Sequence, residues 1–178
     1  IVVVIADTKK AFALGRAQKA GIATKIVSPV AVLGAEKAKA ATKEAKREAV
    51  SDAALACAKE AGADAIVLAG WLTVLAGKII TEFSGRIVNL HPALLPKFGG
   101  VGMWGHFVHE AVLSAHETES GCTVHLVDAG CDTGKILVQK KVPVMPDDTP
   151  ETLYARIAPH EHEAMVEGVC LLAKMVGI

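Results

Sequence analysis

Two polar side chains, Asn89 and His91, stand two residues apart at the end of a short apolar segment. On an extended backbone this spacing points both side chains to the same face. Pro92 disfavours helix at His91, so the pair is expected where a strand ends. An amide donor beside a titratable ring suits oxyanion stabilisation and proton movement in acyl transfer. These residues alone leave open a second reading, in which the pair only ends the strand and closes a turn.

A carboxylate suited to the same chemistry occurs at Asp132, within the glycine-rich turn 130–134. Such a turn either presents the carboxylate to a site or uses it to hydrogen-bond its own backbone. The alternating segment before this turn places Thr123 and His125 on one face. A lone histidine in a strand is more often a core residue than a functional one, so the sequence by itself does not choose between these roles.

The elements that must position these residues alternate between strands and helices along the chain. The sequence predicts one α/β domain over residues 1–178, with a doubly wound, mostly parallel sheet and an antiparallel edge. Pro29 is expected to close the second strand, and segment 99–105, with four glycines in seven residues, is expected to be a mobile loop. The expected strands are 1–6, 24–28, 65–69 and 86–90, the expected hairpin is 122–127 with 135–144, and the expected helices are 11–20, 35–61, 75–83, 107–115 and 149–175.

Composition limits the class of protein. The 19 basic and 19 acidic residues cancel, which argues against a nucleic-acid-binding surface. The four cysteines have no CxxC or zinc spacing, and we expect no metal site. No apolar run is long enough to cross a membrane, and no secretory signal is visible, so a cytoplasmic location is expected. The oligomeric state stays open, with a homodimer among the alternatives.

Segment 89–100, which reads N-L-H-P-A-L-L-P-K-F-G-G, resembles the signature of the folate-dependent formyltransferases. With segments 121–125 and 132–134 in the same order, the chain is most similar to the glycinamide ribonucleotide formyltransferases. The resemblance implies a formyltransferase-like variant of the Rossmann fold. It also implies transfer of a formyl group from 10-formyltetrahydrofolate, a cosubstrate, to the amine of glycinamide ribonucleotide. This step of purine biosynthesis would proceed by direct attack through a tetrahedral intermediate, without a metal.

The resemblance also implies roles for particular residues. Asn89, His91 and Asp132 match the family's catalytic residues, with Asp132 raising the pKa of the histidine and receiving the amine proton. His125 matches a histidine that orients the aspartate, and Thr123 is expected to share that role. Thr73 stands where many members carry an arginine. The expected folate-binding residues are Leu72, Val74, Leu75, Asp128, Ala129 and Gly130, and the expected amine-substrate residues are Glu161, Pro92, Met103 and His109.

Some alternatives remain at this stage. The family usually begins with an additional strand and a glycine-rich turn that holds the substrate phosphate. Residues 1–5 match the family's second strand, so the first is expected to be missing from this chain. A catalytically inactive module that binds folate or nucleotide is therefore an alternative, as is a formyl-folate hydrolase, although the hydrolase motif commonly has a histidine where Pro92 stands. A transfer RNA formyltransferase would need a basic face, which a neutral chain does not favour.

Overall fold

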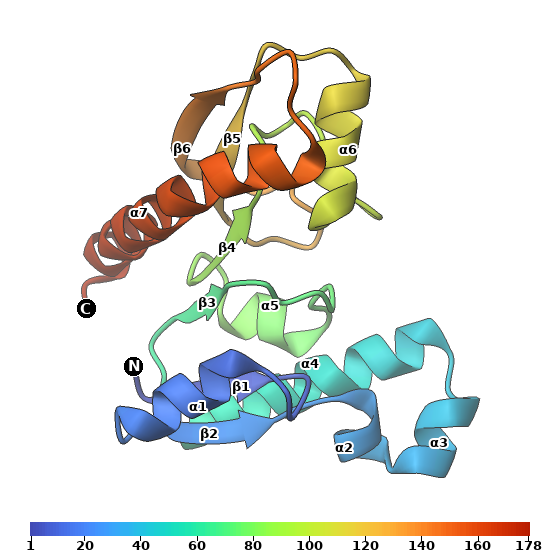
Figure 1. The fold of residues 1–178 in the computed structure, drawn as a ribbon. Coiled ribbons are helices and arrows are strands. Elements are labelled where there is room, and N and C mark those ends of the chain that lie inside the picture. The colour runs from blue at the N-terminus through green and yellow to red at the C-terminus, as the bar shows by residue number, and fades with distance from the viewer. The chain divides into compact units, whose positions relative to one another are not determined.

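The computed structural model describes residues 1–178 and divides them into two compact units (Figure 1). Unit 1 consists of Ile1–Ile66 with Trp71–Ser84. Unit 2 consists of Val67–Gly70 with Gly85–Ile178. Each unit has its own sheet, so the two are described separately.

Unit 1 is built on two parallel strands, β1 (Val3–Ala6) and β2 (Ala23–Ile26), which α1 (Phe12–Lys19) connects. A helical connection between adjacent parallel strands is the usual βαβ arrangement. The long helix α4 (Lys43–Glu60) supplies much of the core, because Val50, Ala54 and Ala58 recur every four residues and are buried. The remaining helices of this unit are α2 (Pro29–Leu33), α3 (Ala35–Ala40) and α5 (Lys78–Glu82).

Two predictions for unit 1 were wrong in detail. The expected helix over 35–61 is interrupted at Ala41, whose backbone is extended, and α4 begins anew because Thr42 caps it by accepting a hydrogen bond from the Ala45 N–H. Pro29 does not simply close a strand. It opens α2 at a first-turn position, behind the N-cap Ser28, because a proline there gives up no intrahelical hydrogen bond.

Unit 2 contains a four-stranded sheet of order β3-β4-β5-β6. Strand β4 (Ile87–His91) pairs antiparallel with β5 (Glu119–Leu126), and β5 pairs antiparallel with β6 (Ile136–Pro143). Strand β3 is the short segment Ile66–Leu68, of which Val67 and Leu68 belong to unit 2. The expected hairpin of β5 and β6 is confirmed, and so is the α/β class. The expectation of a single, mostly parallel sheet was wrong. Backbone hydrogen bonds join the strands into two separate sheets, and the larger one is antiparallel from β4 to β6.

The pairing of β5 with β6 contains a bulge. Thr123 lies opposite Gln139, but His125 lies opposite Ile136, so Leu137 is an additional residue in β6. Directly opposed residues share a face of the sheet. The bulge therefore allows Ile136 and Gln139, three residues apart, to lie on the face that carries Thr123 and His125.

Helices α6 (His106–Ser114) and α7 (Pro150–Val176) complete unit 2, and α7 lies along β5 and β6 (Figure 1). A capping box between Thr149 and Thr152 starts α7, and the helix continues through Pro159. Gly168 lets the helix approach the sheet, because a Cβ at this position would lie 2.5 Å from a methyl group of Val124. No helix of the chain is both long enough and apolar enough to span a membrane.

Candidate active site

Strand register brings the predicted polar residues of unit 2 together. Asn89 lies directly opposite His125, and His91 lies opposite Thr123. Each pair therefore occupies the same face of the β4–β5 ladder. His91, Thr123 and His125 are at most 3% exposed, so their polar atoms depend on protein partners for hydrogen bonds.

His125 fixes the orientation of the Asn89 amide. The Nδ1 atom of His125 lies 2.9 Å from the carbonyl oxygen of Leu126, which only accepts, so Nδ1 carries a proton. Its Nε2 lies 3.2 Å from Asn89 Nδ2, which only donates, so Nε2 is the acceptor. One N–H of the Asn89 amide donates to this ring nitrogen. The second N–H is left to donate to another oxygen.

His91 is held by one ring nitrogen and faces a carboxylate with the other. Its Nε2 donates to the carbonyl oxygen of Phe98 over 2.7 Å, which assigns the proton of the neutral ring to that atom. Its Nδ1 lies 3.5 Å from Asp132 Oδ2. Burial lowers the pKa of His91, and the Asp132 carboxylate and the Phe98 carbonyl offset this effect only in part. The expected influence of Asp132 is present, but desolvation outweighs it, so the ring is neutral near pH 7.

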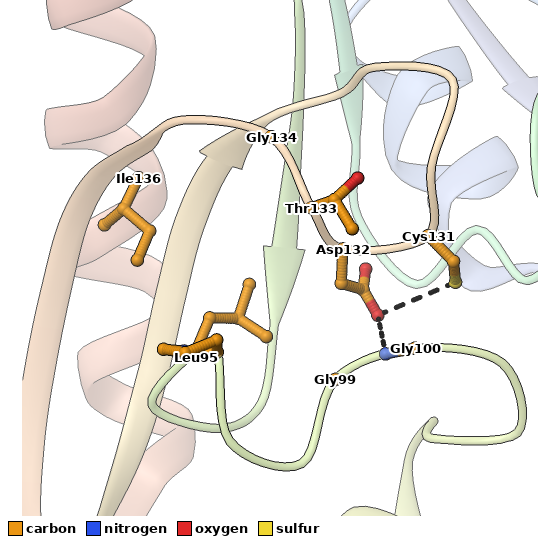
Figure 2. Close-up of a pocket in the computed structure, with 9 residues that line it drawn as sticks. Leu95, Gly99, Gly100, Cys131, Asp132, Thr133, Gly134 and Ile136 are labelled. Carbon is orange, nitrogen blue, oxygen red and sulfur yellow. Dashed lines mark hydrogen bonds between the residues drawn. The ribbon is translucent and has the colours of Figure 1, made fainter.

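Asp132 is the residue on which the two histidines converge. Its side chain is 12% exposed, and Oδ1 lies 3.5 Å from His125 Nε2. The Gly100 N–H donates to Oδ2 over 3.0 Å, as does, more weakly, the Cys131 thiol at 3.8 Å (Figure 2). Burial alone would raise the pKa of Asp132, but His125, the Gly100 N–H and His91 together lower it. The residue is therefore an ionised carboxylate beside a neutral imidazole.

The backbone around Asp132 is built to present this carboxylate. Asp132 adopts a left-handed conformation with φ of 58°, which a short polar residue tolerates better than most. The preceding Asp128 accepts hydrogen bonds from the Gly130 N–H (2.9 Å) and the Thr133 hydroxyl (2.6 Å), which closes the turn. The two carboxylates of this turn therefore have different roles. Asp128 closes the turn, and Asp132 points toward Gly99 and Gly100 (Figure 2).

A pocket of about 430 Å³ opens beside Asp132. It is bordered by two backbone segments of unit 2, one before and one after β5. Apolar side chains and glycine backbone form most of its wall, and Asp132 is the carboxylate that faces it. The lining residues are Leu95, Pro96, Gly99, Gly100, Cys131, Asp132, Thr133, Gly134 and Ile136.

The predicted folate-binding residues are divided between the units. In unit 1, Leu72 and Val74 are exposed (58% and 38%), whereas Leu75 is buried. Arg47 holds this segment by donating to the carbonyl oxygens of Val74 and Leu75, each over 2.7 Å. The other three predicted residues, Asp128, Ala129 and Gly130, form the start of the Asp132 turn in unit 2.

The predicted amine-substrate residues lie at separate places in unit 2. Pro92 directly follows β4, and Met103 is half-buried in the glycine-rich segment. His109 is buried in α6 beside Tyr154, and burial, then the nearby His106 and His91, lowers its pKa. Glu161 lies on α7, where burial raises its pKa. The structure shows no hydrogen bond from any of these side chains to Asn89, His91 or Asp132.

Sequence reasoning missed three groups that hold the site together. Two are backbone atoms, the Phe98 carbonyl and the Gly100 N–H, which residue type does not reveal. The third is the Gln139 side chain, whose place beside Thr123 follows only from the strand register. No group of three or more histidine, cysteine, aspartate or glutamate side chains is arranged to hold a metal ion.

Comparison with known families agrees with this geometry. A family model described as formyl transferase matches residues 1–169, which include parts of both units and all of Asn89, His91, His125 and Asp132. The chain belongs to the formyl transferase family. The predicted resemblance to this family is thereby confirmed.

Several relatives in the formyl transferase family have names that mention purine biosynthesis or the ribonucleotide. The trifunctional purine biosynthetic protein adenosine-3 of Drosophila pseudoobscura pseudoobscura is 41% identical over 174 residues, 97% of this chain and 11% of that protein. The chloroplastic phosphoribosylglycinamide formyltransferase of Arabidopsis thaliana is 46% identical over 108 residues, 61% of this chain and 37% of that protein. This chain thus spans between about a tenth and about half the length of the curated relatives it matches.

Solved structures of formyl transferases share the fold. Glycinamide ribonucleotide transformylase 1 from Symbiobacterium toebii superposes with a TM-score of 0.84 at 34% identity, covering 98% of this chain and 74% of that one. Phosphoribosylglycinamide formyltransferase from Brucella melitensis gives a TM-score of 0.77 at 39% identity, covering 99% and 80%. At these identities the likeness extends to the family as well as the fold.

Proposed function

We propose that this chain transfers the formyl group of 10-formyltetrahydrofolate to the amine of glycinamide ribonucleotide. One observation carries the proposal: Asp132 lies beside both His91 and His125, and His125 in turn holds Asn89. An amide donor, a neutral imidazole and an ionised carboxylate are the groups that formylation of an amine requires. The names of the relatives mention formyl transfer and glycinamide ribonucleotide, which supports the transferred group and the acceptor.

The first step is attack of the amine nitrogen on the formyl carbon, which forms a C–N bond and turns the carbonyl oxygen into an oxyanion. The free N–H of the Asn89 amide donates to that oxygen. Because His125 already holds the other N–H, little reorganisation is needed as negative charge develops.

The second requirement is a place for the proton that the amine loses. His91 Nδ1 has no proton in the neutral ring and faces Asp132 Oδ2 over 3.5 Å. The pair accepts one proton between these atoms, while the Gly100 N–H continues to stabilise the carboxylate. Collapse of the tetrahedral intermediate breaks the bond to N10 of the folate, and the proton that the pair accepted passes to N10 as it leaves, which returns the pair to its starting state.

The proposed binding roles are assigned separately to the predicted residues of each unit. Leu72 and Val74 offer exposed apolar surface suited to the pterin and aminobenzoyl portions of a folate, and the backbone of Asp128, Ala129 and Gly130 offers polar atoms. Glu161, Pro92, Met103 and His109 are proposed to serve the ribonucleotide. Leu75 contributes by packing, since its side chain is buried.

The test is formyl transfer from 10-formyltetrahydrofolate, or a dideaza analogue of it, to glycinamide ribonucleotide, with the formylated product followed by mass spectrometry. Product that disappears in Asp132→Asn supports the proposal. Binding of the folate analogue without turnover would identify an inactive binding module. Release of formate without formylated amine would identify a hydrolase.

A further inference from the structure

Three side chains form a row across the sheet of unit 2. The last residue of the row is not among the proposed catalytic or binding residues. His91 on β4 lies opposite Thr123 on β5, and Thr123 lies opposite Gln139 on β6. Directly opposed residues share one face, so the row starts at the imidazole and ends at the Gln139 amide. Gln139 has no role in the proposed reaction, although its amide nitrogen makes two hydrogen bonds to this region.

Thr123 and Gln139 together hold the segment that follows His91. The Thr123 hydroxyl donates to the Ala93 carbonyl over 2.6 Å and accepts from the Leu95 N–H over 3.1 Å. Gln139 Nε2 donates to Thr123 Oγ1 and to the Leu95 carbonyl, each over 2.9 Å. With one donated and two accepted bonds, the hydroxyl has reached its full capacity. The hydroxyl is also fully buried, which makes the loss of any of these bonds costly.

The segment held in this way carries the backbone groups that orient the catalytic pair. Leu95 is followed three residues later by Phe98, whose carbonyl accepts from His91 Nε2. Two residues further, the Gly100 N–H donates to Asp132 Oδ2. Phe98 has a φ of 56°, a strained conformation for a bulky residue, so its carbonyl stays in place only if the flanking backbone is fixed.

We propose that Gln139 is a positioning residue, which fixes the tautomer and the placement of His91 by anchoring Leu95. The inference deepens the proposed formyl transfer and rests on it for its kinetic consequence. Its structural part, the link from Gln139 through Leu95 and Phe98 to the His91 ring, stands independently of the reaction.

The variants are chosen to separate hydrogen bonding from shape. Gln139→Leu removes both N–H donors at similar size. Gln139→Glu keeps the shape but places carboxylate oxygens against the Leu95 carbonyl at neutral pH. Lys141→Met is the matched control, two residues along the same strand, because Lys141 is exposed and pairs only with Glu119 (3.0 Å) in this structure.

Both Gln139 variants are expected to lower kcat by about 10- to 100-fold, the scale of a small misplacement of catalytic groups. KM for either substrate should change much less than kcat, because the Gln139 side chain lies in none of the proposed binding segments. Lys141→Met should keep the wild-type kcat. Melting temperatures of all three variants are measured to separate positioning from loss of fold.

A second readout does not depend on activity. In protein labelled with ¹⁵N-histidine, the His91 ring, assigned by its loss in His91→Gln, should give the Nε2–H tautomer at neutral pH. In Gln139→Leu the ring nitrogen shifts should move toward a mixture of tautomers. If the His91 shifts move in Gln139→Leu but the wild-type protein transfers no formyl group, the proposed reaction is refuted and the positioning role is supported. Unchanged kcat and unchanged His91 shifts in both Gln139 variants would overturn the inference.

Discussion

The two units hold their predicted functional residues in different ways. In unit 2 the predicted catalytic residues are polar and buried or half-buried, and atoms of neighbouring segments hold them, as the Phe98 carbonyl holds His91 and the Gly100 N–H holds Asp132. In unit 1 the residues are apolar and two of them are exposed. There Arg47 holds only the backbone of the segment, through the carbonyls of Val74 and Leu75.

This difference matches two physical requirements of the proposed reaction. Chemistry on a formyl group needs donors and acceptors placed to a fraction of an ångström, which a satisfied buried network provides. Contact with a flat ring system needs apolar area, which tolerates small shifts of the side chains. Substitutions of the catalytic residues in unit 2 should therefore change kcat, and substitutions in the 72–75 segment of unit 1 should change KM.

The largest effect is expected at the catalytic pair. Asp132→Asn and His91→Ala each remove the place where the amine proton goes, and kcat should fall by about 10² to 10⁴-fold. Steady-state formyl transfer measures this loss, with Asp147→Asn on the exposed segment before α7 as control. A wild-type kcat in either variant would show that this pair of residues in unit 2 does not carry out the reaction.

The next largest effect is expected on stability, at Gly134 between the Asp132 turn and β6. A Cβ on this residue would overlap the carbonyl oxygen of Leu126, so Gly134→Ala must displace backbone. Urea unfolding should show a loss of about 1 to 3 kcal/mol, the usual cost of overpacking. As a control, Gly15→Ala in α1 meets no atom within 4 Å and should not destabilise the fold. Equal stability of the two variants would contradict a tightly fitted turn.

A smaller effect is expected in unit 1. Leu72→Ala and Val74→Ala should raise KM for the formyl donor by about 3- to 10-fold, the equivalent of one or two buried methylene groups, and leave kcat unchanged. Val30→Ala serves as control, since Val30 is also an exposed apolar residue of unit 1 but lies in α2. A fall in kcat with constant KM would contradict the proposal that this segment of unit 1 binds substrate and takes no part in the reaction step.

The smallest change is expected from pH. The His91–Asp132 pair must be without a proton to accept one, and the pKa of each residue is lowered, mainly by burial for His91 and by hydrogen-bond donors and nearby histidines for Asp132. Activity should therefore rise with pH along an acid limb that lies below about 6.5, the ordinary value for histidine. A pH–rate profile of kcat measures this limb, which belongs to the pair rather than to one residue. A limb above that value would show that burial does not dominate at His91.

Much of this site was predictable from the sequence, because it depends on short-range rules. The spacing of Asn89 and His91 predicted a shared face, and Pro92 predicted the end of the strand. Glycines predicted the turn at Asp132. The helix break at Ala41 was less visible, since alanine favours helix and only the capping ability of Thr42 marked the new start.

What could not be predicted depends on contacts between distant segments. The Gly100 N–H reaches Asp132 across 32 residues, and Gln139 reaches Leu95 across 44. No local pattern encodes such pairs, and the lowered pKa of His91 likewise follows from burial that only the packed unit produces. The division into two sheets was missed for the same reason, because apolar runs predict strands but not their partners.

The bulge at Leu137 makes the effect of a length change in β6 depend on where the change occurs. With the additional residue, both Ile136 and Gln139 lie on the face of His125 and Thr123. Deleting Leu137 would leave these two residues two apart, the spacing that shares one face in a regular strand, so the bulge would be lost without turning either side chain over. Inserting a residue between Gln139 and Val142 would instead shift the register of part of β6 by one and turn its side chains to the opposite face. Laboratory evolution that samples insertions and deletions should therefore accept loss of Leu137 more readily than an insertion beyond Gln139, while the exposed stretch at Val101 and Gly102 should accept additional residues.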